Sequence, residues 1–227
     1  MKLLGIDTNA KTVKGQKLGY MTGIMYLAPS NESGKNLCPH ASEGCKAACL
    51  YTAGRGRMAP VKKARLAKTH FFIRERAAFL AQLKTEIVAL VKRAAKNNMI
   101  PAVRLNGTSD LPWENLGVIQ EFPDVQFYDY TKNLKRMVSF VNGELPKNYH
   151  LTFSRSEKTN GAIIVGLLRN GGNVAMVYAG KPPTQNFGAP VVNGDESDLR
   201  FLDAKGVIVA LTAKGDGKKD KSGFVVK

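Results

Sequence analysis

Short apolar segments alternate with helical segments over most of the chain, and this alternation constrains the fold more than any other feature. Strands are expected over 21–28, 102–105, 125–130, 150–153, 174–179 and 206–211. Apolar residues recur at helical spacing over 60–96 (one helix, or two joined near Thr69 and His70), and helices are also expected over 112–120, 134–141 and 160–170. Parallel strands need a crossover connection, so this order predicts a parallel sheet. We expect an α/β fold, built either as an open doubly wound sheet or as a closed or incomplete barrel.

The chain length suits one large domain. We expect a single α/β domain over 1–227, with a polar N-terminal segment at 1–20 and a polar C-terminal tail at 214–227. No stretch approaches the roughly 18 consecutive apolar residues of a membrane span. Asp7 also interrupts the N-terminal segment before a signal-peptide core forms. The expected location is therefore the cytoplasm, with no membrane partner.

A large excess of positive charge favours a polyanionic partner. The chain holds 34 Lys and Arg against 18 Asp and Glu, a formal net charge of +16. Lys and Arg contacts to phosphate supply most of the non-specific affinity for nucleic acid. Six basic residues form a candidate phosphate-contacting ridge: Arg55, Arg57, Lys62, Lys63, Arg65 and Lys68. The alternative is a solvated helix face, and single-stranded and duplex nucleic acids are not distinguished.

All three cysteines, Cys38, Cys45 and Cys49, fall in one short segment after the first expected strand. An odd number of thiols in a cytoplasmic protein argues against a disulfide framework, and thiolates prefer soft metal centres. One interpretation is a [4Fe–4S] cluster on three thiolates, with the fourth iron open or bound by an outside ligand. A second is a zinc site completed by His40. In a third the cysteines bind no metal and are buried or redox-active.

Polar residues gather where the expected strands end, which is where parallel α/β proteins place their functional residues. These residues include Asp110, Asp129, Lys132, Ser154, Arg155, Lys181, Asp195 and Lys214. From the turns at these ends we take Asn106, Asp110, Ser154 and Arg155 as candidate cofactor-binding residues. Asp110 has a second interpretation, as the cap of the helix that follows it.

A three-cysteine segment after the first strand of an incomplete (β/α) barrel resembles the radical S-adenosylmethionine enzymes. The resemblance implies an incomplete parallel barrel and a [4Fe–4S] cluster whose open iron binds S-adenosylmethionine. It also implies that the turn after the second strand holds the amino group of that cofactor. Here the turn is Asn106-Gly107-Thr108-Ser109-Asp110, and Asp110 is the matching acid. The spacing differs from the family pattern, with Cys-x6-Cys-x3-Cys in place of Cys-x3-Cys-x2-Cys.

A closer resemblance is to the bacteriophage gene product 88-like family. Those proteins carry Cys-Pro-x5-Cys-x3-Cys followed by an aromatic residue and a Gly-Arg pair, seen here as Cys49-Leu50-Tyr51 and Gly54-Arg55. They also have an Arg-rich helix and a strand that ends in a Gly/Ser/Asp turn. The likeness covers roughly residues 20–115. It implies a phage or prophage origin, and hence a host cytoplasm, but supplies no established activity.

Three functions are compatible with these features. The first is a phage-type [4Fe–4S] protein that binds nucleic acid. The second is an active radical S-adenosylmethionine enzyme that modifies nucleic acid or protein. The third is a zinc-stabilised module that binds nucleic acid.

Overall fold

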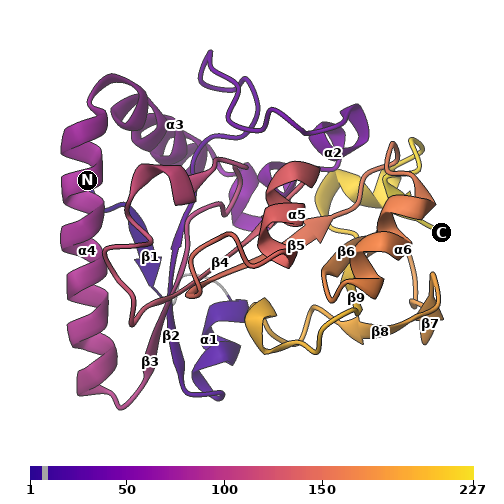
Figure 1. Cartoon of the computed structure of the whole chain (residues 1–227). Helices are drawn as coiled ribbons and strands as arrows, with labels where there is room; N and C mark the ends of the chain where they lie inside the picture. Colours follow the sequence, from indigo (N-terminus) through magenta and orange to yellow (C-terminus); the bar gives the residue numbers. More distant parts are fainter. Residues whose placement is uncertain (7–9) are drawn as a thin grey trace.

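A computed structural model describes the backbone of residues 1–6 and 10–227 (Figure 1). The strands are β1 Leu4–Ile6, β2 Tyr20–Met25, β3 Ile100–Arg104, β4 Gln126–Thr131, β5 Tyr149–Ser154, β6 Asn173–Tyr178, β7 Gln185–Asn186, β8 Ala189–Asn193, β9 Ile208–Thr212 and β10 Val225–Val226. The α-helices are α1 Ala10–Gln16, α2 Glu43–Ala47, α3 Ala59–Arg74, α4 Arg76–Lys96, α5 Leu134–Val141 and α6 Gly161–Arg169. Short 3-10 helices are η1 Leu50–Thr52, η2 Gly54–Arg57, η3 Trp113–Leu116, η4 Arg200–Leu202 and η5 Gly215–Lys219.

These strands form one mostly parallel sheet. Its order is β1-β2-β3-β4-β5-β6-β9-β8-β7, and β10 pairs with β6. All neighbours from β2 to β8 are parallel, while β1 and β7 run antiparallel to their neighbours at the two ends. The predicted α/β class and parallel sheet are confirmed. Within the described residues the sheet is not closed, so the predicted barrel is not confirmed.

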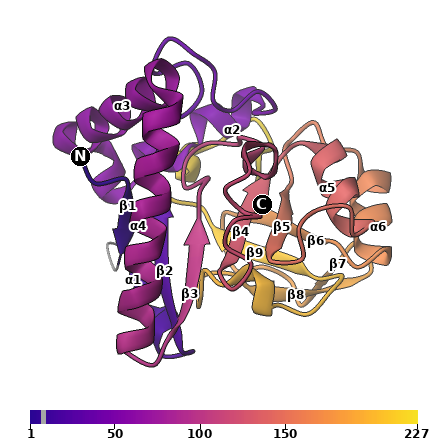
Figure 2. The same cartoon turned by 60° about the vertical axis from the view of Figure 1, so that its left-hand side comes forward.

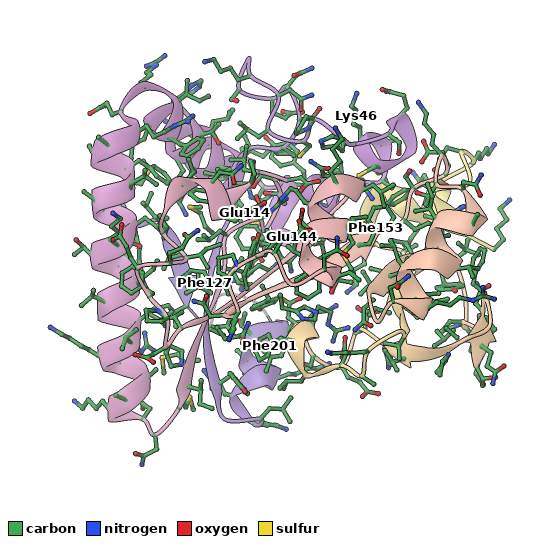
Figure 3. The ribbon with its side chains drawn as sticks, in the orientation of Figure 1. Lys46, Glu114, Phe127, Glu144, Phe153 and Phe201 are labelled. Atoms are coloured by element: carbon green, nitrogen blue, oxygen red, sulfur yellow. The ribbon has the colours of Figure 1, made fainter. Side chains whose placement is uncertain are left out.

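Side chains alternate between the two faces of each strand and give the sheet two different faces. On one face, helices α4, α5 and α6 cover the main apolar core, which includes Phe127 (Figures 1, 2 and 3). On the other face, Tyr128 packs with Ala102 and Leu199. Helix α1 lies on this second face, because a Cβ placed on its Gly15 would lie 3.4 Å from the Leu199 side chain.

Helix α5 has the predicted bounds, but two other helical segments differ from expectation. The 60–96 region forms two helices, which confirms one of the two alternatives. The break between them lies at Glu75, where the backbone leaves the helical region (φ −131°, ψ 54°). The expected break near Thr69 and His70 was therefore wrong. In the 112–120 segment only a 3-10 turn forms. It ends at Gly117, whose φ of 76° is left-handed and stops the helix. In the described part of the chain, no helix is long and apolar enough to span a membrane.

The two segments taken as polar ends belong to the fold. The N-terminal segment carries β1 and α1, and the C-terminal one carries η5 and β10. Strands of three and two residues are too short to give a pattern in the sequence. The C-terminal segment, residues 214–227, packs against one of the three cysteines, with Phe224 in contact with Cys45. Arg155 Nη1 holds this segment by donating to the carbonyl oxygens of Gly223 and Phe224 at 2.6 and 3.0 Å.

Gly44→Ala should loosen this packing. A Cβ at position 44 would overlap Ser222 Oγ and lie 2.8 Å from both Phe224 Cβ and Glu157 Oε2. Overpacking of this kind costs about 1–3 kcal/mol, so we expect a lower Tm and faster proteolysis within 214–227. Gly166→Ala in α6 is the matched control, because its new Cβ meets nothing within 4 Å and alanine favours the helix. Equal Tm values for the two variants would contradict this packing.

Candidate metal and ligand site

A cavity of about 460 Å³ lies at the carboxyl ends of the parallel strands. Its wall is formed by strands β3 to β6 and β9, by Tyr26 directly after β2, by the cysteine segment (residues 38–49) and by the C-terminal segment. The lining residues used below are Lys11, Cys38, Cys45, Cys49, Arg104, Asn106, Asp110, Lys132, Ser154, Asp195, Asp198 and Lys214. Cavities of this size hold small organic molecules.

The three cysteine thiols, here the cysteine group, all lie at this cavity. Cys38 lies in the loop before α2, Cys45 lies in α2, and Cys49 directly precedes η1. All three are half-buried and free of disulfides. Burial raises the pKa of each thiol, and that of Cys38 reaches about 12. The neighbouring thiols raise the pKa of Cys38 and Cys45 further.

A buried guanidinium lies beside Cys49. Arg65 of α3 is only 8% exposed, and it lies over the rings of Tyr26 and Tyr51 at 5.0 and 5.5 Å. Its positive charge lowers the pKa of the Cys49 thiol. The Nε and Nη1 atoms of Arg65 are buried and have no hydrogen-bond partner among the described residues. Since buried charges are normally paired, this cation lacks compensating negative charge.

A second cation lies beside Cys45. Lys132 is half-buried, and its charge lowers the pKa of the Cys45 thiol. The Lys132 Nζ donates to Ser154 Oγ at 2.8 Å and to the Ser154 carbonyl oxygen at 3.1 Å. Burial in turn lowers the pKa of Lys132. The cysteine group therefore has a cation on two sides.

Protein contacts fix the cysteine segment. Ser42 caps α2 by accepting from Cys45 N at 3.2 Å. The Glu157 carboxylate accepts from Ser42 Oγ at 2.6 Å and from Gly44 N at 3.0 Å. The positions of the thiols are therefore set by the fold.

Asn106 organises the turn after β3. Its Oδ1 accepts from Leu111 N at 2.9 Å, and its Nδ2 donates to Asp129 Oδ2 at 3.1 Å. Its backbone N donates to Asp129 Oδ1 at 2.7 Å. The next position, Gly107, requires glycine, because a Cβ there would lie 2.6 Å from the Met25 carbonyl oxygen. Asn106 lines the cavity, but its side-chain atoms already bond within the turn, and ligand binding by it stays a prediction.

Asp110 does not cap the helix that follows it. The first residue of η3 is preceded by Pro112, and no side chain caps that helix. Instead, the Asp110 carboxylate accepts from Arg136 Nη1 at 2.7 Å and from Lys132 N at 2.8 Å. Arg136 also pairs with Glu114 (labelled in Figure 3) through two bonds of 2.6 and 2.8 Å. The capping interpretation was wrong, because an arginine from α5 takes the carboxylate. Binding of an amine by Asp110 stays a prediction.

The other two candidate cofactor residues have different surroundings. Ser154 lines the cavity and accepts from Lys132. Arg155 is used to hold the C-terminal segment. The structure therefore brings Asn106, Asp110 and Ser154 to the same cavity as the cysteine group, and gives Arg155 a structural contact beside it.

The predicted metal ligands do not converge on one point. In the part of the chain that the structure describes, no three His, Cys, Asp or Glu side chains form a group that could hold a metal ion. His40, the alternative zinc ligand, is exposed. It does not line the cavity with the three thiols.

The six predicted phosphate-contacting residues do not form one exposed ridge. Arg65 is buried, and the half-buried Lys68 donates to the Leu3 carbonyl oxygen at 2.8 Å. Lys62 is half-buried over the ring of Tyr51 at 4.7 Å. Only three of the six are exposed: Arg55, Arg57 and Lys63.

The sequence analysis did not single out the pair of Arg104 and Asp198. Arg104 Nη1 donates to both Asp198 carboxylate oxygens at 3.1 and 3.0 Å, and Tyr128 OH donates to Asp198 at 3.1 Å. A signal for Arg104 was present, because it follows Ala102 at the strand period of two and so shares its face. Asp198 lies in an irregular loop after β8, where no periodicity indicates its direction.

Asp129 should make the stability of the fold depend on pH. Burial raises the pKa of this carboxyl from 3.8 to about 7. The folded protein therefore holds a proton that the unfolded chain releases, and the free energy of unfolding should fall as pH rises between these two values. The slope from one such group is at most about 1.4 kcal/mol per pH unit.

The free energy of unfolding is measured with urea from pH 4 to pH 8. Asp129→Asn should remove the fall that Asp129 causes in this free energy as pH rises, whatever the variant does to absolute stability. The exposed Asp124 lies outside the network, so Asp124→Asn should keep the wild-type profile. A slope that survives in Asp129→Asn would show that another group is responsible.

Comparisons with known proteins identify a family. No curated protein and no solved structure matches the chain. None of the comparisons supports the resemblance to radical S-adenosylmethionine enzymes. A family model described as Gene product 88 matches residues 2–227, well beyond the 20–115 region in which the likeness was first seen. This match supports the expected bacteriophage origin. The chain belongs to the Gene product 88 family.

Proposed function

We propose that Cys38, Cys45 and Cys49 bind a [4Fe–4S] cluster at the cavity, in a phage protein that also binds nucleic acid. The observation that carries the cluster is the charge around the thiols. Arg65 and Lys132 flank three cysteines at one cavity, and Arg65 has two buried donor atoms without partners among the described residues. Neutral thiols do not require such cations. Three thiolates on a [4Fe–4S] cluster leave a net negative charge, which would offset part of this positive charge.

The chemistry of the donors favours a cluster over a zinc ion. A zinc site needs its ligands around one point, with sulfur at about 2.3 Å, and His40 is exposed outside the cavity wall. A [4Fe–4S] cluster takes each thiolate on a different iron, so three thiols spread along one cavity wall suit it better. When bound by three thiolates, the cluster supplies one iron that has no protein ligand.

The surrounding residues have separate tasks in this proposal. Ser42 and Glu157 hold the cysteine segment in place, and the C-terminal segment packs against it through Phe224. Lys132 and Arg65 lower the pKa of the thiols next to them. The positive charges of Lys132 and Arg65 therefore favour the thiolate form, which is the form that binds iron.

A basic surface beside the cavity supports nucleic-acid binding. Arg55, Arg57 and Lys63 are exposed next to η1, and η5 packs there through a bond of 3.4 Å from Asp216 N to Thr52 Oγ1. This contact adds lysines that are more than 150 residues away in the sequence. The basic rim consists of Arg55, Arg57, Lys63, Lys218, Lys219 and Lys221, all of them exposed.

An active radical S-adenosylmethionine enzyme is the second candidate. The cavity favours it, since a structural cluster needs no space for a small molecule beside it. Asp110 and Ser154 would then face that molecule. Addition of S-adenosylmethionine to the reduced protein separates the two candidates, because only the enzyme releases 5′-deoxyadenosine.

The cluster predicts a specific loss of iron. Anaerobically purified wild-type protein should contain iron and sulfide and absorb broadly in the visible region. Cys→Ser at position 38, 45 or 49 should remove most of the iron, because a hydroxyl is a poor ligand for this soft centre. His40→Ala should keep the iron, since His40 lies outside the cavity wall. Full iron content in all three serine variants, or zinc that is lost with His40, would contradict the cluster.

The basic rim predicts salt-sensitive binding. Contacts to four to six phosphates give a slope of about −3 to −5 in log Kobs against log salt, with the shallower values for a single strand and the steeper ones for a duplex. Arg55→Glu, Arg57→Glu and Lys63→Glu combined should flatten this slope and weaken binding to every sequence alike, as measured by fluorescence anisotropy.

The matched control reverses the same number of exposed charges elsewhere, at Lys17, Lys92 and Lys96. These residues lie near the amino ends of β2 and β3, away from the cavity. Equal losses of affinity in the two triple variants would show that binding depends on the net charge of the protein and not on the basic rim. No binding at low salt would contradict nucleic-acid binding altogether.

A further inference from the structure

A second group of charged side chains lines the cavity in addition to those beside the cysteines. Lys11 of α1, Arg104 at the end of β3 and Lys214 after β9 supply three cations, which we call the basic pocket. Asp195 and Asp198 supply two carboxylates. The Arg104 side chain is 12% exposed and that of Lys11 is 22% exposed, so these two charges are largely withdrawn from water, while the Lys214 side chain is 46% exposed.

The carboxylates in this group are already satisfied by the protein. Asp195 Oδ1 lies 2.9 Å from Lys11 Nζ and 3.0 Å from Lys214 Nζ, and its Oδ2 accepts from Thr212 N at 2.8 Å. Asp198 accepts from Arg104 through both oxygens. Neither acid is therefore open for a cationic ligand.

The cations, in contrast, keep donors without acceptors. Among the described residues, Lys214 Nζ bonds only to Asp195, and Arg104 bonds only through Nη1. An ammonium has three donors and a guanidinium has five. Nε of Arg104 is buried with no partner among those residues, while burial lowers the pKa of Lys11. Three cations against two saturated carboxylates leave this part of the wall short of negative charge.

Apolar side chains lie next to the basic pocket in the same wall. Tyr130, Leu211 and Val177 line the cavity, and the ring of Tyr130 lies 4.8 Å from the Arg104 guanidinium. A ligand that fills this space would therefore have an acidic group at one position and an apolar body at another.

We propose that the basic pocket binds the oxyanion group, a phosphate or a carboxylate, of a small organic molecule whose body lies against the apolar wall. This inference rests on the proposed function for the nature of the cavity, since it names the class of molecule that meets the cluster. The oxyanion would accept hydrogen bonds from Lys214, Lys11 and Arg104, and would supply the negative charge that they lack.

The test uses phenyl phosphate and benzoate as probes, with benzyl alcohol as their neutral analogue. Binding to the anaerobically purified full-length protein is measured by isothermal titration calorimetry, and iron is assayed in the same samples. Lys214→Gln removes a cation of the basic pocket whose side chain is 46% exposed, so the fold should persist. Lys205→Gln is the matched control, because Lys205 is exposed, precedes β9 at its amino end and does not line the cavity.

We expect an oxyanion probe to bind wild-type protein and the neutral analogue to fail. Loss of a charged hydrogen bond should weaken binding about tenfold or more in Lys214→Gln, and Lys205→Gln should bind as wild type does. Preference for phenyl phosphate would identify a phosphate ester, and preference for benzoate a carboxylic acid. If Lys214→Gln does not fold, Lys11→Gln provides the same comparison.

Equal affinities of Lys214→Gln and Lys205→Gln, or no oxyanion binding to wild type, would overturn the inference. Protein without iron that still binds the probe through Lys214 would contradict the cluster and leave the basic pocket intact. Iron-loaded protein that binds none of the probes would contradict the basic pocket and leave the cluster intact.

Discussion

The pairing of Asp129 with Asn106 fixes the turn on which the cavity depends. Two bonds from Asn106 to a carboxylate that is 1% exposed hold the end of β3 against β4. The same turn then reaches the cysteine segment, because Asp110 N donates to the Leu37 carbonyl oxygen at 2.9 Å. The Cys38 Sγ lies 3.6 Å from the Thr108 carbonyl oxygen in the same turn. One buried carboxylate thus determines where a strand end and a thiol meet.

Charge is arranged around the cavity in three ways. The Arg136 guanidinium donates hydrogen bonds to Asp110, Glu114, Thr131 and Tyr149, so its role is structural. Arg65 is buried with unsatisfied donors beside the cysteine group. Exposed basic residues remain on the rim outside. The net charge of +16 therefore contains separate contributions: Arg136 is paired, Arg65 is buried, and the basic rim is exposed.

Periodicity predicted the parts of the fold that depend on local pattern. The parallel sheet and helix α5 follow from alternating strands and from apolar spacing, and Asn133 caps α5 as a helix start requires. The sequence also showed that the three cysteines lie together at a strand end. These features depend on residues that are neighbours in the chain.

Contacts between distant residues could not be predicted in this way. The helix-cap interpretation of Asp110 failed because its ion-pair partner, Arg136, lies 26 positions later. Arg65 was placed on an exposed ridge because its burial depends on Tyr26, from the end of another strand. The polar composition of 214–227 hid a short strand whose only pattern is two valines. In each case a tertiary partner decided the role of the residue.

Mössbauer spectroscopy of anaerobically purified, isotope-enriched protein tests the three-thiolate cluster most directly. We predict the spectrum of a [4Fe–4S] cluster in which one iron differs from the other three, because three thiolates leave one iron without a protein ligand. Four equivalent irons, a mononuclear iron signal or the absence of bound iron would contradict the assignment of Cys38, Cys45 and Cys49.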